Sequence, residues 1–242
     1  MRNFRPKVVC SLAVSLFLLL VGCSSSTGLV KASGEVFAQS EIHRLTQDPE
    51  NVTHYRPMRI QEMTPQLPSS LQSRIKLVDK TKLPFPVEKE MAYLVSFSSG
   101  PEKEMRHQLQ LTYAQDNEAP ITENFFIVRM TETDENPLAH VKPSASGLDS
   151  FGNVMRVEPL TDDITFYHHI ITTNSSYVYN FYKYDDENQA VNLIVTNAHE
   201  MEFYDQGILY HLAYHTGSTQ LDPTLHDQMV ALAKDSFLSV PK

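Results

Sequence analysis

The chain has 242 residues, 20 of them basic and 29 acidic, and a formal net charge of −9. No basic cluster is present that could follow a phosphate backbone, so nucleic-acid binding is not expected. The chain is long enough to depend on a hydrophobic core rather than on disulfide bonds.

The first 22 residues have the pattern of an export signal. Arg2, Arg5 and Lys7 precede an apolar stretch over residues 8–21. This stretch is shorter than the roughly 20 residues that cross a bilayer, which favours a cleaved signal over a transmembrane anchor. Its removal takes away three basic residues and no acidic one, so the net charge changes from −9 to −12.

The segment Leu20-Val21-Gly22-Cys23 resembles the lipobox of bacterial lipoproteins. The resemblance implies cleavage between Gly22 and Cys23, a diacylglyceryl group on the Cys23 sulfur and N-acylation, palmitate being a typical acyl chain. Two or three acyl chains hold a protein stably on a membrane, whereas one does not. The alternative is a secreted protein with a chance cysteine. Since Cys10 lies in the signal, no intrachain disulfide is expected in the mature chain.

These features predict a lipid-anchored protein on the extracytoplasmic face of the cell membrane, with the membrane as its partner. Ser24 would also permit sorting to an outer membrane in a cell with two membranes. We expect residues 1–22 to be the signal, residues 23–34 a flexible tether and residues 35–242 a single domain. A short helix is predicted within residues 35–47. Five prolines between residues 57 and 86 argue against long elements, although residues 74–78 could form one strand or a helical turn.

From residue 91 onward, β-branched and aromatic runs alternate with polar turn signals, which is typical of antiparallel hairpins. The predicted strands are residues 91–97, 108–113, 124–130, 154–157, 164–171, 177–184, 191–195, 200–203 and 208–214.

The C-terminal segment is predicted to be helical. Asp222 suits the N-cap and Pro223 the first helical position, and Leu225, Met229, Leu232, Ala233 and Phe237 share one side. The fold class is therefore predicted to be α+β, an antiparallel β-sheet meander packed by a C-terminal helix, with a short N-terminal helix.

Residues 83–237 resemble an uncharacterised domain family of extracytoplasmic Gram-positive lipoproteins and sporulation-associated proteins. The residues that carry the resemblance are Leu83-Pro84-Phe85-Pro86-Val87, the strand at 109–113, the hairpin at 201–212 and Ala231-Leu232-Ala233-Lys234-Asp235-Ser236-Phe237. Phe203 stands where members of the family often have tryptophan. The resemblance implies a fold and a location, and no activity.

Ten histidines raise the question of a metal site. On a strand, His168 and His169 point to opposite faces, and His211 and His215 are about 13 Å apart. One zinc ion cannot join either pair. Histidines would have to converge from different strands, so the sequence predicts no metal and no cofactor.

The candidate catalytic motifs are incomplete. The segment 199–203 begins as a zincin motif, but Phe203 replaces the second histidine. The segment 147–152 is one residue too long for a nucleophile elbow. Residues 185–188 lack the spacing of a calcium loop and are expected to form a hairpin turn. No enzymatic activity and no catalytic residue is therefore predicted.

Aromatic side chains are abundant in the predicted strands and have two interpretations. Tyrosines could form a ligand surface, for which the candidates are Tyr177, Tyr179, Tyr210 and Tyr214. The alternative is cross-strand packing in the core. The sequence favours a non-enzymatic binding or accessory protein of the cell envelope, whose protein or small-molecule partner stays unknown. The alternatives are an envelope hydrolase with a histidine–carboxylate site and a lipid carrier with an apolar cavity.

Overall fold

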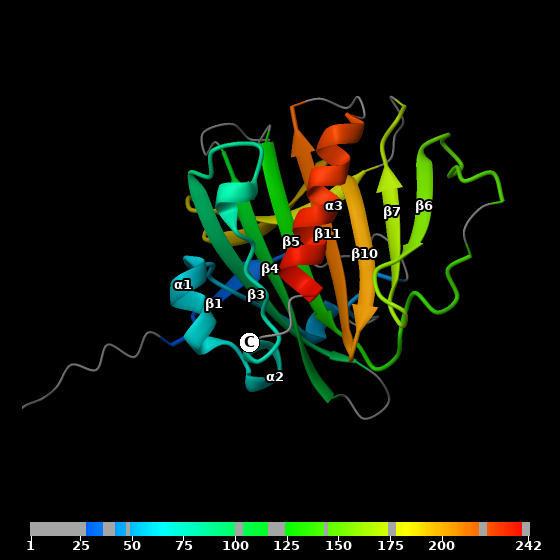
Figure 1. The fold of residues 1–242 in the computed structure, drawn as a ribbon. Helices are drawn as coiled ribbons and strands as arrows, with labels where there is room; N and C mark the ends of the chain where they lie inside the picture. The colour runs from blue at the N-terminus through cyan, green and yellow to red at the C-terminus, as the bar shows by residue number, and fades with distance from the viewer. Residues whose placement is uncertain are drawn as a thin grey trace, which may run out of the picture.

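The structure, a computed structural model, describes residues 28–35, 42–46, 49–99, 104–115, 124–142, 145–173, 178–217 and 222–238. One mixed sheet dominates it, and a C-terminal helix lies across one face of the sheet (Figure 1). The predicted α+β class is therefore confirmed. The strand order in the sheet is β6-β7-β10-β11-β5-β4-β3-β2-β1-β9-β8.

The strands follow the chain in numerical order. They are β1 Lys31–Gly34, β2 Val52–Tyr55, β3 Lys89–Ser99, β4 Glu104–Ala114, β5 Asn124–Glu132, β6 Val154–Pro159, β7 Thr165–Ile170, β8 Tyr179–Asp185, β9 Ala190–Thr196, β10 His199–Asp205 and β11 Ile208–Thr216. The helices are α1 Ile60–Met63, α2 Ser69–Gln72 and α3 Pro223–Leu238, with single 3-10 turns at Pro49–Asn51, Thr64–Gln66 and Lys80–Lys82. All nine predicted strands correspond to β3–β11, and the predicted C-terminal helix is α3.

The sheet departs from a purely antiparallel meander at its N-terminal strands. Neither β1 nor β2 was predicted, and β1 pairs in parallel with β9 while it pairs antiparallel with β2. Residues 31–34 of the expected tether are thus part of the sheet, because β1 joins the hairpin β8–β9 to the other strands. Glycine is needed at Gly34, where a Cβ atom would overlap the His54 ring.

Two further N-terminal predictions differ from the structure. Residues 42–46 contain no helix, and the rest of the helix predicted within 35–47 lies mostly outside the described residues. Residues 74–78 form neither a strand nor a helical turn of the kind predicted. The prolines in this region limit the length of helices, and α1 and α2 accordingly have only four residues each.

One face of the sheet, which we call the helix face, packs against α3. Asp222 caps α3 by accepting hydrogen bonds from the backbone of Thr224 and Leu225. The Phe237 ring meets Phe203 and Tyr210 edge-on, with centroids 5.7 and 5.4 Å away. The apolar side predicted for this helix is therefore the side that covers the sheet.

The opposite face, which we call the hairpin face, is covered in part by β8 and β9 (Figure 1). Phe181 of β8 packs on Phe125 of β5, with ring centroids 5.5 Å apart. Hydrogen bonds from Gln110 and Arg129 on the sheet reach the backbone of β8. The sheet thus curls over itself, and side chains satisfy backbone groups at its β8 edge.

All members of the three hydrophobic clusters lie between Leu29 and Phe237. A chain that lacks residues 1–22 therefore keeps the whole described core. Among the residues that the structure describes, no helix is long and apolar enough to cross a membrane.

Candidate functional site

A row of polar side chains crosses the hairpin face at one level of the sheet. The strand register places Gln110 of β4 opposite Arg129 of β5, Arg129 opposite His211 of β11, and His211 opposite Glu202 of β10. Directly opposed residues have Cβ atoms roughly 5 Å apart and point to the same side. We call these four residues the polar row. Its first three members are at most 2% exposed.

The first half of the polar row holds β8 in place. Arg129 donates to the Asn180 carbonyl at 2.5 Å, and its guanidinium lies 5.4 Å from the centre of the Tyr179 ring. The Gln110 amide donates to the Tyr182 carbonyl and accepts from the Tyr182 amide, both at 2.9 Å. This half is therefore structural, because its polar groups bind backbone that is buried with them.

The second half of the polar row gathers histidines and carboxylates. His211 Nε2 hydrogen-bonds to Glu200, whose side chain lies on the same face of β10 as that of Glu202. His43 Nε2 lies 2.8 Å from Glu202 Oε1, and its ring stacks on His211 with centroids 4.5 Å apart. Four titratable groups from three segments of the chain therefore meet in one place.

Burial determines the charges in this cluster. Burial, followed by the nearby His43, holds the pKa of His211 well below its ordinary value, so this imidazole is neutral and donates to Glu200. Burial by itself raises the pKa of Glu202, but the charge and hydrogen bond of His43 outweigh it and give a net lowering. Glu202 is thus a carboxylate at neutral pH.

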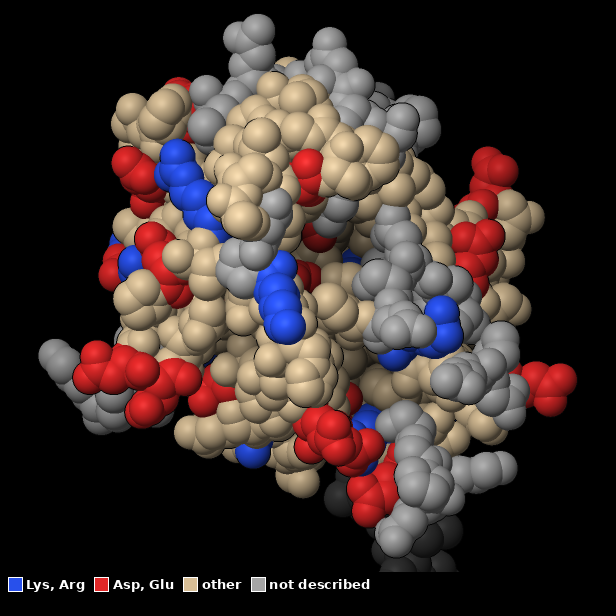
Figure 2. All heavy atoms as spheres, turned by 90° about the vertical axis from the view of Figure 1, so that its right-hand side faces the viewer, with Lys and Arg blue, Asp and Glu red and all other residues tan. Residues whose placement is uncertain are grey.

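A cavity of about 540 Å³ opens beside this cluster, between β6, β7 and β10 and the segments that cover them. Its apolar walls come from Ile42, Val141, Phe151, Met155, Tyr167 and Val178. Its polar residues are His43, Asp149, Ser150, His168, His169, Glu200 and Glu202. Figure 2, which views the molecule from the side of β6, shows a recess near the centre of this face with acidic atoms inside it.

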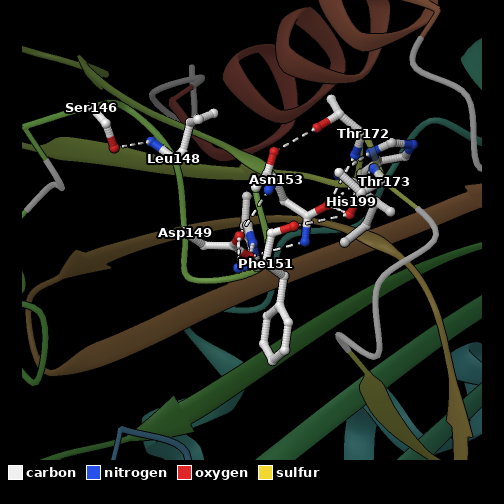
Figure 3. A network of polar contacts seen from close by, with 11 residues as sticks. Ser146, Leu148, Asp149, Phe151, Asn153, Thr172, Thr173 and His199 are labelled. Atoms are coloured by element: carbon white, nitrogen blue, oxygen red, sulfur yellow. Dashed lines mark hydrogen bonds and ion pairs between the residues drawn. The ribbon is translucent and has the colours of Figure 1, made fainter.

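A rigid loop before β6 forms one side of the cavity. The Asn153 side chain is fully buried, and its oxygen accepts from the amides of Thr172 and Thr173 while its nitrogen donates to Asp149. Figure 3 shows Asn153 between Asp149 and the two threonines, with the Phe151 ring pointing away from this network. The loop therefore fixes Asp149 at the cavity wall.

Asp149 orients a second histidine. His169 Nε2 on β7 lies 2.7 Å from Asp149 Oδ2. Burial raises the pKa of the Asp149 carboxyl, but hydrogen bonds from Asn153, His169 and Phe151 outweigh burial and lower it overall. An ionised carboxylate thus holds this imidazole in a fixed position, which is the arrangement of a binding group or a general base.

The predicted tyrosine surface is wrong for the three tyrosines that the structure describes. Tyr179, Tyr210 and Tyr214 are 1%, 5% and 1% exposed, because β8 turns its rings toward the sheet and α3 covers the helix face. Cross-strand packing, the alternative, is their role. Tyr177, Gly22 and Cys23 lie outside the described residues, so the predicted lipidation and cleavage sites stay predictions.

The three incomplete motifs adopt the structures expected of them. The segment 199–203 lies on β10 rather than on a helix, and residues 147–152 form a loop in which Gly147 and Gly152 have positive φ angles of 68° and 85°. Asp185 accepts from the amides of Glu187 and Asn188 in the turn between β8 and β9. Backbone amides of this turn thus donate to the Asp185 carboxylate.

The histidine–carboxylate cluster was missed from the sequence. His211 and Glu202 were each placed on a predicted strand, but nothing in the sequence indicated that the two side chains would meet. A signal of burial was present, since Arg129 and His211 each interrupt an apolar run on a strand of high β-propensity. No protein-family model, curated protein or solved structure matches the chain, so its function is inferred from this cavity and its side chains.

Proposed function

We propose that the chain is a lipid-anchored binding protein on the extracytoplasmic face of a bacterial membrane, and that it holds a small molecule in the cavity beside β6, β7 and β10. The observation that supports binding best is the cavity itself. Its volume of about 540 Å³ falls within the range of small-molecule sites, roughly 300–1,000 Å³.

The lining suggests the chemistry of the ligand. Met155, Tyr167 and Phe151 give apolar contact area, whereas His43 and Glu202 form a polar end. A molecule with an apolar body and one polar head group would bury its body against the former and direct its head group to the latter. Amphipathic molecules of the cell envelope have this form, which agrees with the proposed location.

Narrowing the cavity is expected to weaken binding roughly 5- to 150-fold, since overpacking of a filled site costs roughly 1–3 kcal/mol. The probe is N-phenyl-1-naphthylamine, a neutral apolar dye that fluoresces when it leaves water, and the protein is the chain without residues 1–22. We expect saturable binding to this chain and roughly 5- to 150-fold weaker binding to Met155→Trp.

The matched control is Val157→Trp, which adds the same ring two residues further along β6 at an exposed position outside the cavity lining. This variant should bind the dye as the unchanged chain does. Equal affinity for all three proteins, or no saturable binding to the unchanged chain, would contradict the proposal.

The proposed membrane location has a separate test at Cys23. In the Cys23→Ser variant, a hydroxyl replaces the thiol that receives the diacylglyceryl group, so we expect an uncleaved precursor without lipid. Electrophoretic mobility and detergent partitioning of membrane fractions would report both changes. If the serine variant were processed and partitioned into detergent as before, the lipid anchor at Cys23 would be refuted.

A hydrolase is the second candidate function, and one pair of residues favours it. His169 is oriented by Asp149 at the cavity wall, as a general base is oriented in hydrolases. Turnover of p-nitrophenyl acyl esters that Asp149→Asn abolishes would favour this candidate. Dye binding without turnover would favour a binding protein.

A further inference from the structure

His43, Glu202 and His211 form a group whose geometry points beyond ligand burial. One ligand atom from each lies within 4.8 Å of the other two. The Glu202 Oε1 atom is 2.8 Å from His43 Nε2 and 3.8 Å from His211 Nε2. Ligand atoms of a tetrahedral zinc ion lie about 3.4 Å from one another, as bond lengths near 2.1 Å require.

We propose that His43, Glu202 and His211 bind a divalent transition-metal ion such as Zn²⁺ at the polar end of the cavity. Two imidazoles and one carboxylate are a donor set that zinc and iron accept, whereas magnesium and calcium prefer oxygen alone. The inference rests on the proposed function in one respect, because the cavity supplies the open coordination positions.

The surroundings of the three side chains suit a metal site. Glu200 accepts the hydrogen bond of His211 Nε2, so an ion bound to that nitrogen would replace the proton and have the Glu200 carboxylate within reach as a fourth ligand. His211 and Glu202 stand on paired strands β11 and β10, a rigid base for two of the ligands.

A metal held here would contact a ligand in the cavity directly. His43, Glu200 and Glu202 all line the cavity, so at least one coordination position of the ion would face it. The head group of the bound molecule would then be an anionic oxygen, such as a carboxylate or phosphate, which binds an open position on zinc. Without the ion, three carboxylates in the lining would repel such a group.

The experiment uses the chain without residues 1–22, purified without a polyhistidine tag and freed of metal with a chelator. Zn²⁺ is titrated by calorimetry, and Co²⁺ is bound as a visible-absorption probe of coordination. We expect one ion per chain. The variants His43→Ala and Glu202→Gln should bind at least about 100-fold more weakly, because even loss of a second-shell partner costs 10–100-fold.

The matched control is His140→Ala, which removes an exposed histidine that lies outside the cluster. It should bind Zn²⁺ as the unchanged chain does. The inference is overturned if Zn²⁺ shows no 1:1 binding, if the two ligand variants bind normally, or if the control loses as much affinity as they do. Circular dichroism of each variant verifies that the sheet is intact.

Dye binding separates the two proposals. If the dye binds saturably and Zn²⁺ does not bind, the cavity function stands and the metal inference fails. If Zn²⁺ binds as expected and the dye does not bind, the metal inference stands without an apolar ligand. Failure of both titrations removes both proposals.

Discussion

Acidification from about pH 7.5 to about pH 4.5 is expected to lower the free energy of unfolding by about 6 kcal/mol, a large part of the 5–15 kcal/mol typical of folded proteins. Three buried histidines cause the effect. Burial lowers the pKa of His54, His168 and His199 to about 4. In the last two, positive charge on His226 adds to the effect of burial.

The direction follows from which state binds protons. Above the unfolded value of about 6.5, each imidazole is neutral in both states and contributes nothing. Between about pH 6.5 and 4, the unfolded chain takes up the protons while the folded chain does not, so stability falls. Each histidine contributes about 2 kcal/mol after allowance for screening. Asp149 and Glu202, whose pKa values are lowered, would lose their stabilising effect below this range.

Urea unfolding followed by far-ultraviolet circular dichroism at a series of pH values measures this loss. His199→Asn should reduce the loss by about 2 kcal/mol, because the amide oxygen can still accept from the Ile171 amide and takes up no proton. His140→Asn, at an exposed position, is the matched control and should leave the pH dependence unchanged. A constant free energy of unfolding from pH 7 to 5 would refute the assignment of neutral buried histidines.

Arg129→Met is expected to destabilise the fold by about 1–3 kcal/mol, because it leaves buried acceptors without their donor. Arg129 is 1% exposed and donates to the Asn180 carbonyl at 2.5 Å. Its guanidinium also lies over the Tyr179 and Tyr182 rings. Methionine fills much of the same space but leaves the carbonyl of β8 buried without this donor.

Chemical unfolding of three variants tests this role. Arg129→Lys should have an intermediate loss, because it keeps the charge and lacks the planar fork of donors. Arg156→Met, at an exposed position on β6, should change stability by no more than about 0.5 kcal/mol. A loss below about 1 kcal/mol for Arg129→Met would show that the polar row does not hold β8 against the sheet.

Local signals in the sequence were sufficient for the elements from residue 91 onward. Alternation placed Ile208, Tyr210, Leu212 and Tyr214 on one face, and all four lie in the core under α3. The cap at Asp222 marked the start of that helix. The strand β1 escaped prediction because its four residues, Lys31 to Gly34, have neither β-branched nor aromatic side chains and depend on their neighbours for pairing.

The candidate site could not be predicted because it depends on pairing between distant segments. His211 meets Arg129 because β11 pairs with β5, whose sequence lies about 80 residues earlier. His43 comes from the segment 35–47, for which a helix was predicted, whereas residues 42–46 contain none. Glu200 and Glu202 lie on a predicted strand, and they are covered because the sheet curls and loops close over it. Topology, rather than local propensity, therefore creates the cluster.

Occupation of the cavity by a small molecule is the central claim, and methionine methyl resonances test it most directly. In the chain without residues 1–22, labelled at its methionine methyl groups, N-phenyl-1-naphthylamine should shift the Met155 resonance in a saturable way. Met201, on the opposite face of β10, and the exposed Met105 should stay unchanged. A constant Met155 resonance at saturating dye, or a shift confined to Met201, would contradict binding in this cavity.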